Sequence, residues 1–404
     1  MAPRALSLQA YMAYARSSAA LGSNGSDNDW PKRRPGPLVW GHAQGRDAGR
    51  ALAHLFARMA QQRPELQFIL SGDAEPSPGM AHVTLPAERA SECEKFAQDL
   101  RPDFCLWAGT DLSPALLHAV SDAGAYMIAL TTPEDTWRSR VPRWLPDPTN
   151  ATLALFDLIH IRSESTRRML RRHGIGADRL RLAGPFLDTG TPLDCPDPQL
   201  EEVTAALAGR PVWLSARTRP EEAADVLRAH RRAMRLAHRL LLILVPNDAA
   251  DFETITSIAK AEQMRLCLWD NGESPDENTH VLLIEGPEEL GLWYRLAPLA
   301  FLGGSLVPGH GGSDPYEAAA LGTAILYGPN VGRHLSSYSK LVEAGAARIV
   351  RDTDSLATAV SHLVAPDQAA TMAHAGWDVV SSGAELIDSV TAEVFDRIDA
   401  QETP

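Results

Sequence analysis

The sequence is poor in cysteine and lysine, and it contains no long hydrophobic run. Its four cysteines, Cys93, Cys105, Cys195 and Cys267, lie far apart and form no CxxC pair. This spacing argues against a zinc site and against a disulfide framework. It favours a reducing compartment such as the cytosol.

The composition excludes a polytopic membrane protein. The first apolar stretch, residues 5–16, is interrupted by Gln9 and Arg16 and is too short to cross a bilayer. Such a stretch predicts an amphipathic helix, which lies either on a membrane surface or on its own protein. The sequence favours neither alternative.

Positive charge is also in short supply. Lys and Arg number 38 against 51 Asp and Glu, which gives a net charge of −13. A net-acidic chain is a poor general binder of nucleic-acid phosphates, so we expect no nucleic acid among its partners. The 404 residues, 45% of them hydrophobic and 22% charged, predict a globular protein of two domains.

Strands and helices alternate in two consecutive series, which divide the chain. Residues 1–36 hold the amphipathic segment and much of a Gly- and Pro-rich stretch, residues 21–37, which we expect to be a mobile linker. The first series occupies residues 37–200, and the second occupies 201–404 with helices at its end. The expected strands are residues 38–40, 67–70, 104–107, 126–130 and 158–161, then 211–215, 240–245, 281–284, 299–302, 324–327 and 348–350; the expected helices are 51–62, 114–123, 165–173, 221–236 and 252–263.

This alternation is typical of an α/β fold with parallel sheets. We predict two doubly wound, Rossmann-like domains facing a cleft, joined by the irregular residues 188–198. In such sheets ligands bind beyond the carboxyl ends of the strands. The loops that follow the strands are therefore the places to look for chemistry.

The densest signal is the segment of residues 300–317, in which a buried strand runs into two glycine pairs and then a helix start. The glycines allow the backbone to approach a ligand closely. Asp314 is the expected N-cap and Pro315 the first helical residue, so that the helix start is suited to a phosphate. Glu317, one turn later, offers two oxygens to the vicinal hydroxyls of a ribose.

Arginines follow another strand of the second series. Arg217 and Arg219 come directly after residues 211–215, and they supply cationic partners for a carboxylate or a phosphate. His310 and Arg333 are weaker candidates of the same kind. Together these loops predict an anion-binding site at one edge of the second sheet.

The sequence resembles the 3-deoxy-D-manno-octulosonic acid (Kdo) transferases of lipopolysaccharide assembly, from about residue 38 to residue 350. Residues 289–297, 301–308, 311–322 and 328–329 are similar to the family motifs ELGLLY, FVGGSLVP, GGHNPLEPAALG and FGP. The family has the two-domain GT-B fold of glycosyltransferases, which agrees with the fold predicted from the alternation.

The resemblance implies a CMP-Kdo donor held by the C-terminal domain, a lipid A precursor held by the N-terminal domain, and an inverting transfer without a required metal or cofactor. It places the protein in the cytoplasm, at the inner membrane, with which peripheral contact is expected. The implied nucleotide contacts are Pro246, Asn247, Glu285, Gly286, Pro287, Gly311, Gly312, Ser313, Asp314, Pro315, Tyr316 and Glu317.

The N-terminal motifs depart from the family pattern. The family's HAxSxGE, whose Glu is the general base, becomes residues 42–48, with Ala48 at the Glu position and Asp47 beside it. We expect Asp47 to serve as the base, since a carboxylate near the acceptor hydroxyl is what the step needs. The family's ETELWPN corresponds to residues 109–115, in which Asp111 is the only acid. Leu187 stands where the family has a Lys. In the second series, Asn247 replaces an Arg of the family.

These departures leave alternatives open. Glu317 is either a ribose contact or an acid favoured by the helix dipole. Asp47 is either the base or a solvated acid, and Asp111 is either functional or a helix cap. The chain itself is either a Kdo transferase, a divergent GT-B transferase that uses another nucleotide sugar, or a catalytically silent nucleotide-binding paralogue.

Overall fold

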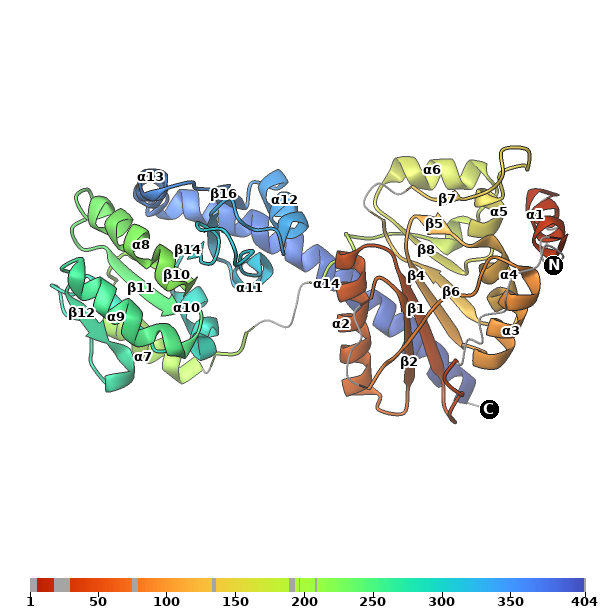
Figure 1. Cartoon of the computed structure of the whole chain (residues 1–404), viewed down its shortest axis with the longest axis horizontal. Helices are drawn as coiled ribbons and strands as arrows, with labels where there is room; N and C mark the ends of the chain where they lie inside the picture. The colour runs from red at the N-terminus through yellow and green to blue at the C-terminus, as the bar shows by residue number, and fades with distance from the viewer. Residues whose placement is uncertain are drawn as a thin grey trace. The chain divides into compact units, whose positions relative to one another are not determined.

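The computed structural model describes residues 6–17, 30–74, 79–132, 136–188, 193–195, 197–207 and 209–402. The chain forms two compact units (Figure 1). Unit 1 comprises residues 1–188 and 382–404, and unit 2 comprises residues 189–381. Each unit is described by itself.

Unit 1 is built on a seven-stranded parallel sheet with the order β3-β2-β1-β4-β6-β8-β9. Its interior strand β1 is buried along its whole length, as expected of a parallel strand covered on both faces. Successive side chains serve opposite faces: Val39 packs with Leu52 and Phe56 of one helix, whereas Trp40 packs with Phe96 on the other side. The strands are β1 Leu38–Ala43, β2 Gln67–Gly72, β3 Ala81–Val83, β4 Phe104–Ala108, β6 Tyr126–Ala129, β8 Leu158–Ile161 and β9 Leu180–Leu182, and a separate pair joins β5 Asp111–Leu112 to β7 Arg138–Ser139.

The helices of unit 1 cover both faces of this sheet. They are α1 Leu6–Ser17, α2 Arg46–Gln62, α3 Ala90–Leu100, α4 Pro114–Asp122, α5 Thr149–Leu153 and α6 Glu164–Arg172. In α2 the apolar residues Leu52, Leu55, Phe56 and Met59 recur at helical spacing and are all buried, which confirms the helix that their spacing predicts.

Unit 2 repeats the architecture with the strand order β12-β13-β11-β10-β14-β15-β16. Its strands are β10 Val212–Thr218, β11 Leu241–Pro246, β12 Leu266–Leu268, β13 Val281–Leu283, β14 Leu299–Leu302, β15 Ala324–Tyr327 and β16 Ala347–Ile349. Its helices are α7 Asp197–Leu207, α8 Pro220–Ala233, α9 Phe252–Ala261, α10 Leu290–Leu296, α11 Pro315–Ala320, α12 Leu335–Glu343 and α13 Thr353–Leu363. The predicted fold class, two doubly wound α/β domains with parallel sheets, is confirmed.

The last helix, α14 Pro366–Glu402, departs from the predicted division of the chain. Residues 382–404 group with unit 1, although the sequence assigns all of 201–404 to the second domain, and residues 189–200 group with unit 2. The physical reason is the apolar face of its final turns. Leu386, Ile387, Val390 and Val394 are buried in the same cluster as Leu52 of α2. Periodicity predicts a helix here, but it does not say which sheet the helix covers.

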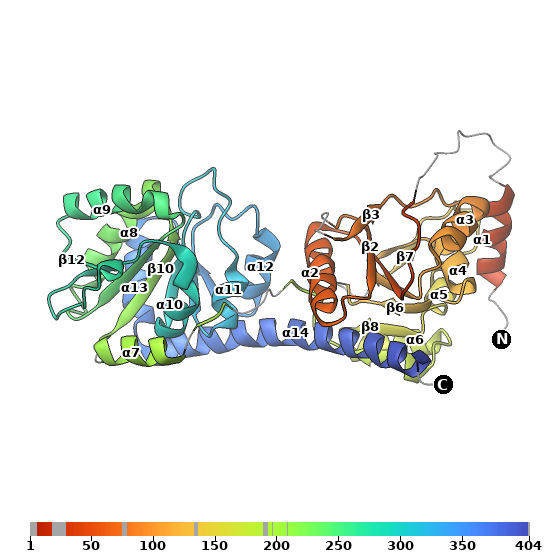
Figure 2. The same cartoon turned by 90° about the horizontal axis from the view of Figure 1, so that it is seen from below.

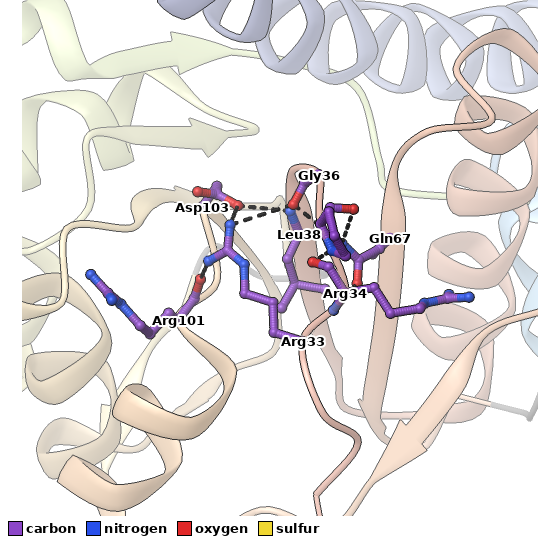
Figure 3. A network of polar contacts seen from close by, with 8 residues as sticks. Arg33, Arg34, Gly36, Leu38, Gln67, Arg101 and Asp103 are labelled. Carbon is purple, nitrogen blue, oxygen red and sulfur yellow. Dashed lines mark hydrogen bonds and ion pairs between the residues drawn. The ribbon is translucent and has the colours of Figure 1, made fainter.

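The segment before β1 also differs from the prediction. Residues 21–29 of the expected mobile linker lie outside the described residues, but residues 30–37 are held against the sheet (Figure 3). Asp103 accepts hydrogen bonds from Arg33 and from the Leu38 N–H, both at 2.7 Å. The Gln67 amide donates to the Arg34 carbonyl at 2.7 Å and accepts from the Arg34 N–H at 2.9 Å. These contacts fix the entry into β1.

The amphipathic segment forms α1, which packs beside α3, α4 and α5 (Figure 2). Leu8, Tyr11, Met12 and Ala15 are buried in the core of unit 1, so this face of the helix docks on its own protein. Among the described residues, no helix combines the length and the hydropathy that a membrane crossing requires.

Candidate active site

Unit 2 contains a cavity of about 190 Å³ at the carboxyl ends of its central strands. Its walls come from the loops after β10, β11 and β14, from α11 and from the segment after β15. The lining residues are Arg217, Arg219, Asn247, Gly304, His310, Gly312, Ser313, Asp314, Glu317 and Arg333. The cavity therefore brings together the two predicted arginines, His310, Arg333 and five of the predicted nucleotide contacts.

Arg217 has an unusual backbone conformation. It lies in the left-handed region with a φ of 53°, at a register shift between β10 and β11. Such strain costs about 1–3 kcal/mol and persists only where the surroundings impose it. Its side chain binds Glu317 through two nitrogens: Nη2 lies 3.0 Å from Oε2 and 3.1 Å from Oε1, and Nε lies 3.3 Å from Oε2. The ion pair aims both side chains into the cavity.

The loop between β14 and α11 depends on glycine. Gly304, Gly311 and Gly312 have φ values of 67°, 82° and 79°, which side chains rarely tolerate. A Cβ at Gly312 would lie 2.9 Å from the Val331 side chain. These glycines let the loop fold back on itself beside the cavity. The close approach of their backbone to a ligand stays a prediction.

The predicted helix start is confirmed. Asp314 caps α11, because its carboxylate accepts the Tyr316 N–H at 2.9 Å, and Pro315 occupies the first turn. Ser313 donates to the Gly303 carbonyl at 3.0 Å, which ties the cap to the end of β14.

Arg219 is held by two contacts. When the Asn247 amide is oriented with its oxygen toward Arg219, that oxygen accepts from both terminal guanidinium nitrogens, at 3.0 and 3.2 Å. The Arg219 N–H donates to Glu222 at 3.1 Å. Asn247, one of the departures from the family pattern, thus serves here as a partner of an arginine.

Glu222 is a residue that sequence reasoning missed. It is fully buried in α8, and its carboxylate also accepts the N–H groups of Gly304 and Leu306. Burial raises its pKa, and these N–H groups partly oppose the shift. It joins the loops after β10 and β14 from behind the cavity. The sequence signal is the capping-box spacing from Arg219 to Glu222.

Other predicted contacts lie outside this cavity. Pro246 ends β11 and is buried, and Pro315 and Tyr316 are buried residues of the first turn of α11. Glu285 is exposed, and its N–H donates to Asp270 at 2.7 Å. Gly286 and Pro287 begin a short turn, and Gly311 lies beside Arg333. The nucleotide role of these residues stays a prediction.

Unit 1 has a larger cavity of about 650 Å³ at the carboxyl ends of β1 and β2. The apolar part of its wall consists of Tyr11, Leu85, Leu112 and Pro114. The remaining lining residues are His42, Ala43, Gln44, Gly45, Gly72, Asp73, Glu88, Thr110, Asp111, Ser113 and Arg140. A cavity of this size and mixed polarity suits a ligand with both a polar head and an apolar portion.

Asp111 lines this cavity in a double ion pair. It contacts Arg138 and, at 2.7 Å, Arg140. The hydrogen bond from Arg138 lowers the pKa of Asp111, and Arg140 adds to the shift. A carboxylate held in this way is a poor proton acceptor, which weighs against a role as base.

Asp47 lies in the first turn of α2 and forms an ion pair with Arg50 at 3.2 Å. Its side chain is 36% exposed. It is not among the described residues that line the cavity of unit 1. The structure brings His42, Gln44 and Asp111 to the cavity, but it places Asp47 beside it. Its role as the base stays a prediction.

A search for metal ligands gives no candidate in the described parts of the chain. No group of three or more His, Cys, Asp or Glu side chains there is arranged to hold an ion.

Comparison with known sequences points to one family. Residues 23–186 match the family described as 3-deoxy-D-manno-octulosonic-acid transferase (kdotransferase). The chain is 25% identical to the 3-deoxy-D-manno-octulosonic acid transferase of Haemophilus influenzae, over 74% of this chain and 70% of the relative. It is 26% identical to the protein of that name from Bordetella pertussis, over 74% and 71%.

Solved structures also match. The C-terminal CMP-Kdo binding domain of WaaA from Acinetobacter baumannii is 21% identical, with a TM-score of 0.40, over 46% of this chain and 97% of that one. A glycosyltransferase from Rickettsia africae is 11% identical, with a TM-score of 0.42, over 92% and 100%.

Proposed function

Because the chain belongs to the Kdo transferase family of glycosyltransferases, we propose that it transfers Kdo from CMP-Kdo to a lipid A precursor, with inversion at the anomeric carbon. Unit 2 binds the donor and unit 1 binds the acceptor. The observation that carries this proposal is the charge of the cavity in unit 2.

The donor carries two anionic groups, the carboxylate of the sugar and the phosphate of the nucleotide. The cavity in unit 2 presents three arginines, Arg217, Arg219 and Arg333, together with His310. Arginine is suited to both anions because its planar donors bind two oxygens at once. At about 190 Å³ the cavity is smaller than the usual ligand pocket of about 300–1,000 Å³, so it holds the phosphate and its neighbours rather than the whole donor.

The acceptor site is the cavity in unit 1. Its apolar wall, which includes Tyr11, Leu85 and Leu112, suits the lipid portion of the acceptor, and its polar wall suits the sugar head. Arg140, whose side chain is 80% exposed, offers a cation to an acidic head group.

The chemical step is a single displacement. The acceptor hydroxyl oxygen attacks the anomeric carbon, and the bond from that carbon to the phosphate oxygen breaks. CMP leaves with the bonding electrons, and the hydroxyl proton passes to a carboxylate of unit 1. Arg217 and Arg219 stabilise the charge that gathers on the departing phosphate.

The surface beside the acceptor cavity supports peripheral contact with the inner membrane from the cytoplasm. Leu6 of α1 is 83% exposed and Trp144 is 72% exposed, and Tyr14 packs edge-on against Trp144. Arg138 and Arg140 lie exposed in the same region of unit 1, where they can meet anionic head groups.

Ala48 favours a second candidate. It stands at the position of the family's general base, so a catalytically silent nucleotide-binding protein is the alternative. Asn247 likewise favours a transferase for another nucleotide sugar.

The test is transfer by the purified protein. We expect CMP release and a Kdo-modified lipid when CMP-Kdo and a lipid A precursor are supplied together. Thermal stabilisation by CMP without product identifies the silent alternative. Transfer from a different nucleotide sugar, with stabilisation by UDP and not by CMP, identifies a transferase that uses another nucleotide sugar. Absence of any nucleotide binding contradicts all three.

A further inference from the structure

The acceptor cavity has three carboxylates in its wall, Asp73, Glu88 and Asp111. A transfer that removes a proton from a hydroxyl needs one carboxylate that can reach the hydroxyl and accept the proton. The contacts of the three side chains differ, and they separate structural acids from a reactive one.

Glu88 is committed to structure. It accepts the hydroxyl of Tyr11 at 2.8 Å and the N–H groups of Ala115 and Leu116 at 3.0 and 3.2 Å. It thus joins α1 to the start of α4. Both of its oxygens are used, and burial raises its pKa despite these bonds. Removing it would disturb two helices.

Asp111 is committed to its two arginines, as described above, and its N–H is bound by the Gln44 amide oxygen at 2.8 Å. Protonation would break two ion pairs. A proton acceptor of this kind is unfavourable in a step that must take up a proton and release it in each turnover.

His42 is the histidine among the residues that line the cavity. Its Nδ1 lies 3.1 Å from the Ser71 hydroxyl, and its Nε2 lies 3.4 Å from the Gln44 amide nitrogen. Burial lowers its pKa to about 4, so the ring is neutral near pH 7 and a weak proton acceptor. It packs 4.1 Å from Trp107, centroid to centroid, and forms a fixed part of the wall.

Asp73 differs from all of these. It directly follows β2, and its Oδ2 accepts the Gly45 N–H at 2.7 Å. A carboxylate offers about four acceptor positions on two oxygens, so the second oxygen can take a hydroxyl proton. The residue is exposed at the cavity, where a substrate can reach it.

The backbone around Asp73 is held in place. Its N–H donates to the Ala43 carbonyl at 2.9 Å. A side chain at Gly49 of α2 would overlap the Asp73 carbonyl, so the helix packs directly on this turn. Gly45 belongs to the segment that replaces the family's base motif, and Gly49 directly follows that segment. The carboxylate is therefore anchored to that segment although it comes from another strand.

We propose that Asp73 is the general base of this protein and takes the place of the acid that Ala48 lacks. This inference rests on the proposed Kdo transfer. The hydroxyl proton passes to the free oxygen of Asp73 as the new carbon–oxygen bond forms and the bond to the CMP phosphate breaks. Asp73 then returns the proton to solvent.

The test compares Asp73→Asn, Asp47→Asn and Asp99→Asn in Kdo transfer. The amide oxygen introduced by Asp73→Asn can still accept the Gly45 N–H, so the loop keeps its anchor. We expect kcat to fall by about 10²–10⁴-fold in D73N, the range for loss of a general base. KM for both substrates and the melting temperature stay within error. D47N loses less, and D99N, an exposed acid of α3, behaves as the wild type.

A second variant separates chemistry from folding. In Asp73→Ala we expect added formate to restore part of kcat, because a small carboxylate can enter the vacated position. If D73N retains activity within fivefold of an active wild type, or if D47N is the more damaged of the two, the inference is wrong and the proposed function stands. If the wild-type protein transfers no Kdo, both the inference and the proposed function are wrong.

Discussion

The two units share one architecture, but their cavities are built in different ways. In unit 2 the cavity depends on backbone that side chains rarely adopt and on a bidentate ion pair between Arg217 and Glu317. In unit 1 the cavity is larger, and its acids come from several unconnected loops.

This difference explains why the sequence motifs are similar to the family pattern in one unit and depart from it in the other. A glycine with positive φ is costly to replace, so its position in the sequence is constrained by the fold. A carboxylate needs only to reach the cavity, and it can do so from a neighbouring strand. If this comparison is right, the cavity of unit 2 is sensitive to changes in its backbone and in the side chains that hold its loops.

The largest effect is expected at Glu222. Glu222→Ala leaves the buried N–H groups of Arg219, Gly304 and Leu306 without their acceptor, so we expect unit 2 to lose about 3 kcal/mol of stability or more. Denaturant unfolding measures the loss. In Glu222→Gln the amide oxygen still accepts a hydrogen bond, and the loss should be smaller. Equal losses in the two variants would contradict the hydrogen-bond explanation.

The next effect is expected in the glycine loop. Gly312→Ala forces a side chain into a φ of 79°, 2.9 Å from Val331, and should cost about 1–2 kcal/mol and weaken CMP binding. Gly332→Ala is the matched control, because a Cβ there has no neighbour within 4 Å and the residue has no positive φ. Calorimetric titration with CMP compares the two. Loss of binding in the control alone would refute the assigned role.

A smaller effect is expected at the ion pair. Lysine cannot reproduce the two-nitrogen contact of Arg217 with Glu317, so Arg217→Lys should raise KM for the donor about tenfold while KM for the acceptor stays constant. Arg228→Lys, which alters an exposed pair with Glu262, serves as the control. An unchanged donor KM would mean that Arg217 does not contact the donor.

The smallest effect concerns unit 1 at acid pH. Arg138 and Arg140 hold the pKa of Asp111 below its ordinary value of 3.8 in the folded protein. A depressed folded-state pKa adds stability above the unfolded value, and this is lost as the pH falls through the folded value. The arginines are exposed, so Asp111→Asn should cost less than about 1 kcal/mol at pH 7. The difference between variant and wild type should shrink below pH 3.8, and thermal unfolding at several pH values measures it. A difference that grows toward acid pH would contradict this assignment.

Much of the fold could be predicted because local patterns decide it. The buried runs of β1, β4, β10 and β11 read as strands of a parallel sheet, and the spacing within α2 reads as a helix packed on it. The candidate anion site in unit 2 was predicted from the order of glycines, cap and acid in one continuous segment. Arg217 and Arg219 were predicted because they follow the expected strand of residues 211–215, and the observed strand β10 extends past Arg217 to Thr218.

The acids of unit 1 could not be ranked in the same way. Asp47 and Asp111 stand in segments that resemble family motifs, whereas Asp73 stands in a loop without a recognisable pattern. Its place beside Gly45 arises from the pairing of β1 with β2 and from the packing of α2 on the turn. Glu222 was missed for a related reason, since its partners Gly304 and Leu306 are about eighty residues away in the sequence.

The sequence by itself determined the two parallel sheets, the helix start at Asp314 and the similarity to one family, because each depends on residues that are close together along the chain. Only the tertiary structure decided that the end of α14 covers unit 1, that residues 30–37 are held by Asp103 and Gln67, and which carboxylates meet in the cavity of unit 1. Those outcomes depend on contacts between segments that are distant in the sequence, and local sequence patterns do not predict such contacts.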